Sequence, residues 1–463
     1  MNWTCLHGRM SLLSACIACL ALSMAPAFAD QPPCHVDAAA TGADNGSSWQ
    51  DAYPNLQLAL QDQSCSEIWV AAGLYLPDSS DRAAAFTLRN NLAIYGGFAG
   101  TETQLSQRDW ASNETILSGD IGEAGDDSDN AFNVVIASGT DQTARLDGFT
   151  ITAGNADDED WDFESECIHS CGGGIRMFEG SPHLANLTIT NNFARWGGGG
   201  LFAQQNSEPQ LENVHFIANS TDSLGGGMYL IKSHASLVDV SMHGNSASSG
   251  GGMFNDDSDP DLRNVTFSNN SVSTSGGGIW NFGSNPTLVN VTFSGNSAGG
   301  GGGMRNSSSS PILRNVTFRN NSAAAFNGGG GMRNGLNSAP RLNNVIMSGS
   351  TNGDCVNDSG NLLNWQSSHN LFESANSAIN CGSQGYLDNI VGVSAQLEAL
   401  DDNGGNTRTH ALRITSPAIG AGRNDLCPDV DQRGLSRPQG EACDMGAYEF
   451  QDLLFSDRFQ SGH

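Results

Sequence analysis

The chain has 463 residues and a formal net charge of −29 at pH 7, because 49 Asp and Glu residues outnumber 20 Lys and Arg residues. This balance disfavours nucleic acids and anionic membranes as partners, and it favours solubility and the binding of cations. Beyond the first 29 residues, no run approaches the ~18 apolar residues that a transmembrane helix requires. We therefore expect no nucleic-acid partner and no transmembrane segment.

Residues 1–29 have the pattern of an export signal peptide. Arg9 supplies a positive charge, Met10 to Met24 form an apolar run, and Ala27-Phe28-Ala29 is a small-x-small cleavage site. The mature chain is therefore expected to begin at Asp30 and to be extracellular or held at the cell surface, in association with the outer membrane. We expect it to be a monomer.

Residues 30–66 are predicted to form an N-terminal cap. A short helix near Tyr53 to Gln61 would cover the open end of a hydrophobic core. Cys34 and Cys65 are placed to fasten this cap. A repetitive region follows, which we expect to span residues 67–420.

An internal repeat of about 26 residues, clearest over residues 172–350, determines the predicted architecture. A segment of the form Leu-x-Asn-Val-Thr-Phe recurs, as in Leu262 to Phe267, and its apolar and polar residues alternate as in a half-buried strand. A unit of this length has room for two or three short strands and no helix, and stacked units bury a continuous core. The sequence therefore predicts an all-β fold, a single-stranded parallel β-helix. The third position of the segment is occupied by Asn186, Asn213, Asp239, Asn264, Asn290, Asn315 and Asn344.

A second set of asparagines recurs at one phase of the repeat, and each unit also carries a run of glycines. Asparagine tolerates left-handed turn geometry, and its amide can bond to the same amide one coil along. The glycine runs lack the Gly-Lys-Ser/Thr ending of a phosphate loop and are interpreted as coil corners where backbones approach closely. Both features are therefore interpreted as structural. The asparagines are Asn192, Asn219, Asn245, Asn270, Asn296 and Asn321.

Two parts of the repeat carry a resemblance to a known family. Phe267-x-x-Asn270 followed by Gly276-Gly277-Gly278-Ile279 resembles the FxxN and GGAI repeats of polymorphic outer-membrane proteins. The resemblance covers about residues 172–350. It implies a right-handed parallel β-helix of the pectin-lyase-like class, with a short N-terminal capping helix.

The C-terminal region carries a second resemblance. Asp402-Asn403-Gly404-Gly405, Ser416-Pro417-Ala418-Ile419 and Gly446-Ala447-Tyr448-Glu449 resemble the choice-of-anchor endings of secreted β-helix proteins. This resemblance implies a C-terminal cap of the anchor type at residues 421–450. Residues 451–463 would then form a tail.

Removal of the signal peptide leaves eight of the eleven cysteines. An even number in an exported chain indicates disulfides, although the sequence leaves their connectivity open. Cys355 and Cys381 are 26 residues apart, which is one coil, and the ~4.8 Å between neighbouring coils suits a disulfide. The cysteines fall into four local couples: Cys34 and Cys65, Cys167 and Cys171, Cys355 and Cys381, and Cys427 and Cys443.

One residue per coil follows each glycine run and its inward aliphatic residue, and this residue is expected to face outward. Four consecutive aromatic residues at this position would form a strip ~15–20 Å long. Exposed aromatic faces commonly stack on sugars, which predicts a glycan-binding surface, whereas an aromatic stack that stabilises the sheet or lies under a loop is the alternative. After Arg176, the candidate ligand-binding residues in coil order are Phe202, Tyr229, Phe254, Trp280, Arg305 and Arg333.

The insert from Asp157 to Glu166 interrupts the repeat with a dense group of carboxylates. Carboxylate oxygens are preferred ligands of Ca²⁺, so Asp157, Asp158 and Asp160 are candidate metal ligands and Ca²⁺ is the candidate cofactor. No EF-hand or nonapeptide calcium spacing is present, and a solvated acidic loop is the favoured interpretation. No other cofactor is expected.

Catalysis by a pectate-lyase mechanism would require stacked acidic residues for Ca²⁺ and a basic residue as the proton abstractor. Asp256 and Asp257 fall near Tyr229 and Lys232 in the repeat, but the neighbouring coils add no carboxylate column. The sequence therefore favours a non-catalytic exported protein that binds a polysaccharide or cell-surface glycan, and it assigns no catalytic residue. The alternatives are a diverged polysaccharide lyase or glycoside hydrolase, and a structural spacer.

Overall fold

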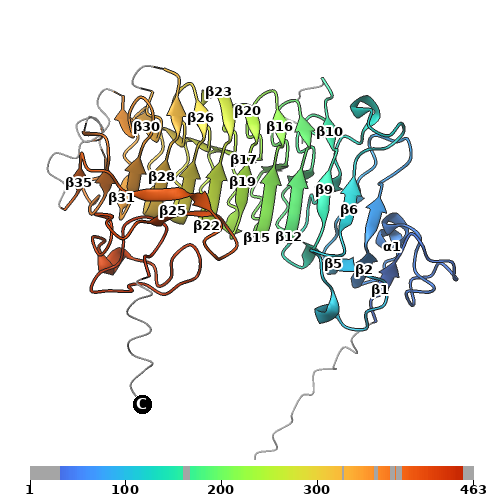
Figure 1. The fold of residues 1–463 in the computed structure, drawn as a ribbon. Coiled ribbons are helices and arrows are strands. Elements are labelled where there is room, and N and C mark those ends of the chain that lie inside the picture. Colours follow the sequence, from blue (N-terminus) through green and yellow to red (C-terminus); the bar gives the residue numbers. More distant parts are fainter. Residues whose placement is uncertain are drawn as a thin grey trace, which may run out of the picture.

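The chain folds into a right-handed parallel β-helix whose coils stack along one axis (Figure 1). The computed structural model describes residues 32–159, 167–325, 328–358, 363–375, 381 and 388–451. The predicted signal peptide at 1–29, Asp160 and all but the first residue of the predicted tail at 451–463 lie outside the described residues. The predicted fold class is confirmed.

Three parallel sheets form the solenoid, and sheet A is the longest, whereas sheet C covers only residues 155–323. Sheet A contains β1 (Cys34–Val36), β2 (Glu67–Ala71), β3 (Gly73–Tyr75), β5 (Leu92–Phe98), β6 (Thr115–Ser118), β8 (Ala144–Asp147), β9 (Thr150–Thr152), β12 (His183–Thr190), β15 (Gln210–Ile217), β18 (Ser236–Val238), β19 (Ser241–His243), β22 (Asp261–Ser268), β25 (Thr287–Ser294), β28 (Ile312–Arg319), β31 (Arg341–Asn343), β32 (Ile346–Ser348), β34 (Leu371–Phe372) and β35 (Ile390–Val391). Sheet B contains β4 (Phe86–Thr87), β7 (Val135–Ile136), β11 (Ile175–Phe178), β14 (Leu201–Gln204), β17 (Met228–Ile231), β21 (Met253–Asp256), β24 (Ile279–Phe282), β27 (Met304–Ser307), β30 (Met332–Gly335) and β33 (Cys355–Asn357). Sheet C contains β10 (Asn155–Ala156), β13 (Phe193–Ala194), β16 (Ser220–Thr221), β20 (Ser246–Ser249), β23 (Ser271–Ser275), β26 (Ser297–Ala298) and β29 (Ser322–Ala323).

The repeated Leu-x-Asn-Val-Thr-Phe segment bends at its asparagine. Asn264 has a φ of 57°, in the left-handed region that asparagine adopts more readily than most residues. Because the chain turns there, Leu262, Val265 and Phe267 all enter the core, although a straight strand would place the first two on opposite faces. The same left-handed conformation occurs at Asn186, Asn213, Asp239, Asn290, Asn315 and Asn344.

Identical side chains stack along the core. The rings of Phe267 and Phe293 are 4.9 Å apart and nearly parallel, and those of Phe293 and Phe318 are 4.5 Å apart. The corner glycines permit this spacing. A Cβ at Gly278 would lie 2.5 Å from the carbonyl oxygen of Gly303 and 2.8 Å from the Phe293 ring. The interpretation of the glycine runs as corners of close backbone approach is confirmed.

The predicted asparagine ladder is present and buried. Each amide nitrogen donates to the amide oxygen of the next coil, over 3.0 Å from Asn192 to Asn219 and 2.9 Å from Asn270 to Asn296. The left-handed geometry expected at these asparagines is wrong, because it falls one residue earlier, as at Asn269. A second buried ladder, which the sequence did not reveal, joins Asn255, Asn281, Asn306, Asn334 and Asn357 inside sheet B.

The N-terminal end is covered by a short helix, as predicted. Helix α1 (Leu56–Gln61) begins later than expected, and Asn55 caps it by accepting a hydrogen bond from the backbone N–H of Leu58. It buries Leu56, Ala59 and Leu60. The solenoid begins within the expected cap at 30–66, because β1 already pairs in parallel with β2.

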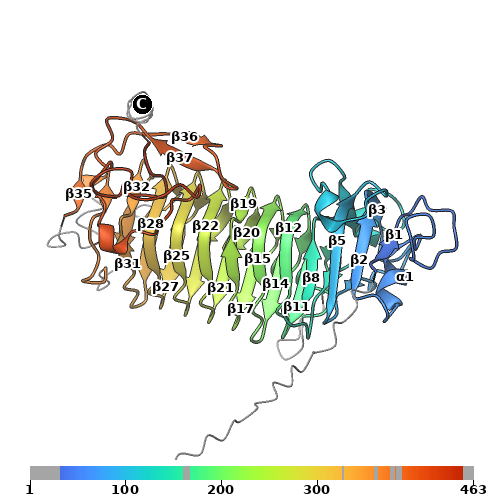
Figure 2. The same cartoon turned by 90° about the horizontal axis from the view of Figure 1, so that it is seen from below.

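The C-terminal part of the chain leaves the solenoid earlier than predicted. Parallel pairing ends at β35, whereas the β-helix was expected to continue to residue 420. Strands β36 (Leu397–Asp401) and β37 (Thr409–Leu412) pair with each other in antiparallel fashion and pack apolar residues on Ile346 and Leu371. Residues 395–451, named here the C-terminal segment, thus lie along the outer face of sheet A (Figure 2).

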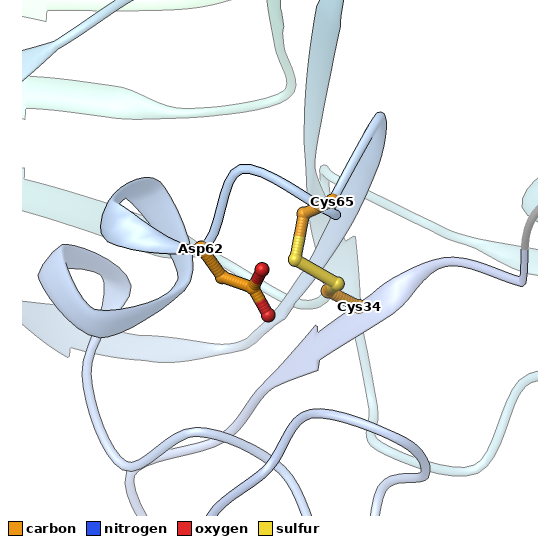
Figure 3. A group of neighbouring side chains, drawn as sticks. All are labelled: Cys34, Asp62 and Cys65. Carbon is orange, nitrogen blue, oxygen red and sulfur yellow. A yellow bond between two sulfur atoms is a disulfide. The ribbon is translucent and has the colours of Figure 1, made fainter.

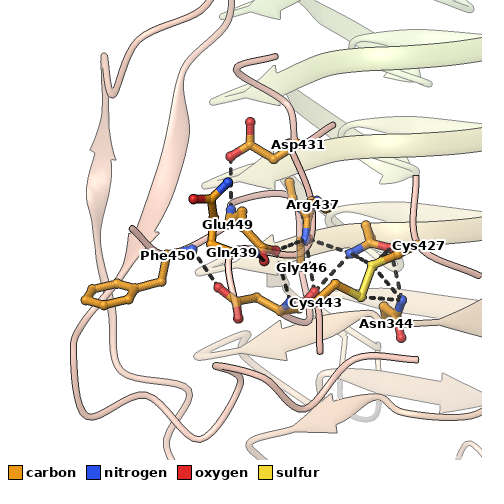
Figure 4. A network of polar contacts seen from close by, with 12 residues as sticks. Asn344, Cys427, Asp431, Arg437, Gln439, Cys443, Gly446, Glu449 and Phe450 are labelled. Atoms are coloured by element: carbon orange, nitrogen blue, oxygen red, sulfur yellow. Dashed lines mark hydrogen bonds and ion pairs between the residues drawn. A yellow bond between two sulfur atoms is a disulfide. The ribbon is translucent and has the colours of Figure 1, made fainter. Parts of the chain in front are cut away.

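A buried ion pair organises the end of the C-terminal segment (Figure 4). The Arg437 guanidinium contacts the Glu449 carboxylate at 2.8 Å, and both side chains are almost fully buried. Arg437 also donates to the carbonyl oxygens of Asp444 and Gly446, while Glu449 accepts from the backbone N–H groups of Gln439 and Asp444. These bonds satisfy charges that burial would otherwise make costly.

All four cysteine couples form disulfides, which fixes the connectivity that the sequence left open. The Cα atoms are 5.8 Å apart in Cys34–Cys65, 5.6 Å in Cys167–Cys171, 5.8 Å in Cys355–Cys381 and 6.7 Å in Cys427–Cys443. Cys355 and Cys381 lie one coil apart along the chain, as the spacing indicated. Among the described residues, no helix has the length and hydropathy needed to cross a membrane.

Candidate functional site on sheet B

The predicted outward residues line up on the outer face of sheet B. Parallel pairing places Phe202 beside Tyr229, Tyr229 beside Phe254, Phe254 beside Trp280, and then Arg305 and Arg333 in the same column. The aromatic rings meet edge to face, with centroids 5.5, 5.1 and 5.0 Å apart in coil order. The predicted alignment is therefore present.

Most of the aromatic column is nevertheless covered. Phe202, Tyr229 and Phe254 are 1%, 4% and 4% exposed, so the expectation of an exposed strip is wrong for these three residues. Trp196 and Leu224, which precede the glycine runs of their coils, pack against the rings. These residues match the alternative interpretation, an aromatic stack under a loop.

The cover ends at the coil of Trp280. Leu224 is bridged to Ser249 in the next coil, and Ser275 is bridged to Gly300 further along, so small residues replace large ones at this corner. As a result Trp280 is only half-buried, and Phe282, on the same face of β24, is 45% exposed. Two aromatic rings thus face solvent where the cover stops.

Two arginines share one carboxylate beside these rings. Arg305 Nη2 lies 3.2 Å from Asp358 Oδ2, and Arg333 Nε lies 3.0 Å from Asp358 Oδ1. Glycines make room for the cluster. A Cβ at Gly300 would lie 2.9 Å from the Arg333 guanidinium, and one at Gly335 would lie 2.5 Å from Asp358.

The cluster keeps an excess positive charge. Burial lowers the pKa of Arg305, whose side chain is 13% exposed, yet guanidinium groups stay protonated at neutral pH. Its Nη1 atom is buried and has no hydrogen-bond partner among the residues that the structure describes. We name this group the sheet B platform: Trp280, Phe282, Arg305, Arg333 and Asp358. Aromatic faces can stack on sugar rings, and a guanidinium can donate paired hydrogen bonds to hydroxyl or carboxylate oxygens.

The residues considered for catalysis lie beside the platform but do not form one site. The Tyr229 side chain is buried, and that burial raises the pKa of its hydroxyl. Asp256 is half-buried and pairs in register with Phe282, and burial followed by the nearby Asp257 charge raises the pKa of its carboxyl. Lys232 is exposed at a turn. Of these four residues, Asp256 is the one whose environment suits acid–base chemistry.

Asp157 is engaged in an ion pair, and Asp158 lies near a histidine whose pKa is lowered by burial. Asp157 contacts the Arg82 guanidinium at 2.6 Å, and Asp158 lies 3.7 Å from His169. Asp160 lies outside the described residues. Ca²⁺ binding by the insert stays a prediction, because both described carboxylates keep about a third of their side-chain surface exposed and Asp160 is not described.

One group of potential metal ligands converges within the described residues, formed by Cys34, Asp62 and Cys65 (Figure 3). The two sulfur atoms are joined in a disulfide, so neither is available as a thiolate. Asp62 accepts hydrogen bonds from the Tyr53 hydroxyl at 2.7 Å and from Ser64. This group does not fit a metal ion.

Comparison with known proteins supports the fold. Residues 150–297 match a family model described as right handed beta helix region. The crystal structure of pectate lyase Pel9A is similar, with a TM-score of 0.50 and 13% sequence identity, and the match covers 91% of this chain and 98% of that chain. At this identity the similarity concerns the fold alone. A search of curated proteins finds no match.

Sequence reasoning missed two members of the platform. Phe282 occurs two residues after Trp280 and therefore lies on the same face of the strand. Asp358 follows Asn357, the last amide of the sheet B ladder, and occupies the column of Phe282 and Ser307. Continuing the repeat count past residue 350 would have found it. The repeat is hard to recognise at this coil because no glycine run precedes β33.

Proposed function

We propose that this protein is an exported, non-catalytic β-helix protein that binds a polysaccharide or cell-surface glycan at the sheet B platform. The observation that carries the proposal is the pairing of two solvent-facing rings with two arginines that share a single carboxylate. A fold shared with a pectate lyase is consistent with a polysaccharide-related role.

The dimensions of the platform support an extended ligand. The strand of Trp280 and β33, which Asp358 follows, are separated by three coil steps. At ~4.8 Å a step they span ~15 Å along the solenoid axis. A glycan chain lying along the axis would meet the rings first and the guanidinium groups next.

The decisive experiment is retention of the mature chain on a panel of immobilised neutral and acidic polysaccharides. Loss of a stacking ring or of a charged hydrogen bond costs about 1–2 kcal/mol, so Trp280→Ala and Arg333→Gln should each weaken binding by about five- to thirtyfold. Trp110→Ala and Arg263→Gln are the matched controls, since both residues are exposed and lie off sheet B. Equal retention of all four variants would refute the site.

A diverged polysaccharide lyase or glycoside hydrolase is the second candidate. It is favoured by the raised pKa of Asp256 next to Phe282 on the same face. Incubation with the same polysaccharides, with and without Ca²⁺, distinguishes the two. New unsaturated or reducing ends that vanish in Asp256→Asn would establish catalysis and overturn the non-catalytic proposal. A spacer would neither bind nor cleave.

Surface location is part of the proposal and rests on the signal-like residues 1–29 and on the anchor-type C-terminal resemblance. The four disulfides are typical of chains that fold outside the cytosol. Fractionation of the producing cells should recover the processed chain, beginning at Asp30, from the surface or the medium. Recovery of unprocessed chain from the cytosol would contradict this part.

A further inference from the structure

A groove opens on the other side of the solenoid, where the loop between β36 and β37 lies over sheet A. It has a volume of about 270 Å³. Its floor comes from β15, β19 and β22, and its end wall comes from the loop between β36 and β37. The lining residues are His215, Ile217, Ser241, His243, Thr266, Ser268, Asn406, Thr407 and Arg408.

Three hydrogen bonds hold the end wall in place. Thr266 Oγ1 donates to the Arg408 carbonyl oxygen at 2.7 Å, and Thr407 Oγ1 donates to the Asn264 carbonyl oxygen at 3.0 Å. The Asn406 amide donates to Asp239 at 2.9 Å. The groove is therefore a built feature of the contact between the C-terminal segment and sheet A.

Two histidines in the floor are oriented in the same way by the following coil. His215 Nδ1 lies 2.8 Å from Ser241 Oγ, and His243 Nδ1 lies 3.0 Å from Ser268 Oγ. Their Nε2 atoms form no hydrogen bond within the described residues, so both edges are available to a ligand. The serine hydroxyls can donate or accept, which allows either imidazole to present an Nε2 proton.

The charge of the groove is opposite to that of the chain. Its lining has one arginine and no carboxylate, in a protein with 49 acidic and 20 basic residues, and burial lowers the pKa of His215 so that this imidazole contributes hydrogen bonds rather than charge. The Arg408 guanidinium makes no ion pair with any described residue. Asp239, which is not part of the lining, accepts hydrogen bonds from the amides of Asn406 and Asn264.

We propose that this groove binds an oxyanion, a sulfate, phosphate or carboxylate group carried by a small molecule or by the end of a glycan. Arg408 supplies a planar pair of N–H donors and the two imidazoles supply Nε2–H donors, while the Thr266 and Ser268 hydroxyls bond to the Arg408 carbonyl oxygen and to His243. The site is separate from the sheet B platform, and its failure would leave the platform untouched.

Titration of the imidazole NMR signals tests the site in the intact mature chain. Sodium sulfate, sodium phosphate and sodium glucuronate are added separately at constant ionic strength, with sodium chloride and glucose as references. We expect saturable shifts of the His215 and His243 signals, assigned with His215→Asn and His243→Asn, for at least one oxyanion. The three anions distinguish the chemical sources.

Arg408→Gln should weaken that binding at least fivefold, whereas Arg413→Gln should not change it. Arg413 lies on the same hairpin, pairs with Glu398 and is absent from the groove lining. The Arg408 side chain makes no hydrogen bond or ion pair with a described residue, so its substitution should leave the melting temperature unchanged. Shifts that do not saturate, that sodium chloride reproduces, or that persist equally in Arg408→Gln would overturn the proposal.

Discussion

Buried amides show how single residues specify this solenoid. Asn296 bonds to Asn321, to the Phe267 carbonyl oxygen and to the backbone N–H of Asn270, so one side chain joins three coils. A hydrophobic residue could fill the same volume but would leave those groups without partners. Register between coils is therefore encoded by hydrogen bonds as well as by apolar packing.

Asn296→Ala is expected to be strongly destabilising. It leaves a buried N–H, a carbonyl and an amide without their partners, and each such group costs about 1–3 kcal/mol. We expect the free energy of unfolding to fall by roughly 3 kcal/mol or more in urea titration. Ser273→Ala, at an exposed position of β23, is the control and should change it by less than about 0.5 kcal/mol. An unchanged midpoint for Asn296→Ala would contradict the role of the ladder.

His410 gives the C-terminal segment a response to acid. Its ring is buried between the Glu398 carbonyl oxygen and Ser294 Oγ, and burial lowers its pKa from 6.5 to about 4. The unfolded chain takes up this proton near pH 6.5, whereas the folded chain takes it up near pH 4. The neutral ring therefore makes its full contribution to the free energy of unfolding above pH 6.5. This contribution, roughly 3 kcal/mol, is lost as the pH falls to 4.

Comparison of His410→Gln with the unaltered chain isolates this effect. Burial raises the pKa of Asp354 and of Asp444 to about 6, so these groups act in the opposite sense and favour the folded chain as the pH falls. Both carboxyls are present in each protein, so their effect on stability cancels when the two free energies of unfolding are subtracted. The stability gap between the two proteins should narrow between pH 7 and pH 4. A gap that is constant with pH would show that His410 does not titrate in this way.

Packing between elements decides which outward residues reach solvent. Phe202 and Trp280 occupy equivalent positions after a glycine run, yet one is covered and the other half-exposed. Trp196 and Leu224 pack over the rings of the earlier coils, whereas the corner position of Leu224 is taken by Ser249 in the next coil and by Ser275 and Gly300 further along. Of the predicted ligand-binding strip, only the end that begins at Trp280 is therefore open to a ligand.

The C-terminal segment is expected to detach without unfolding the coils beneath it. Glu449→Gln removes the partner of the buried Arg437 guanidinium, which costs about 3–5 kcal/mol. Limited proteolysis should then cut within residues 395–451 while sheet A stays protected. Arg413→Gln, which alters an exposed pair with Glu398, should leave the cleavage pattern unchanged. Simultaneous loss of the whole chain would show that the segment and the solenoid unfold together.

At the scale of the molecule, the features that recur in every coil could be predicted from the sequence, and the features that occur once could not. The same residue pattern recurs in each coil. It predicts the 25- to 29-residue spacing, the core positions and the amide ladder. The course of the C-terminal segment could not be predicted, because its contacts, such as Thr266 with Arg408, join residues without any shared period. The burial of Tyr229 could not be predicted either. It depends on side chains of neighbouring coils, whereas the repeat pattern describes each position of a coil by itself.

The net charge of −29 also acts on the whole molecule. Like charges repel in the compact state, and salt screens them over about 8–10 Å at physiological ionic strength. The melting temperature is therefore expected to rise by a few degrees between low salt and physiological sodium chloride. Sucrose at matched osmolality is the control for effects other than screening. A fall in melting temperature would show that the ion pairs, such as Arg82 with Asp157, outweigh the repulsion.

The stacking of near-identical coils sets how this protein can change in length. Loss or gain of one residue inside a strand would move the inward residues of that strand to the opposite face, whereas the turns already absorb such changes, because coils of different length keep the ladder amides bonded. Loss or gain of a whole coil would preserve them all and move the platform by one step of ~4.8 Å relative to the N-terminal end. The length of the solenoid therefore changes in steps of one coil. We expect its evolution to proceed by duplication or loss of complete coils.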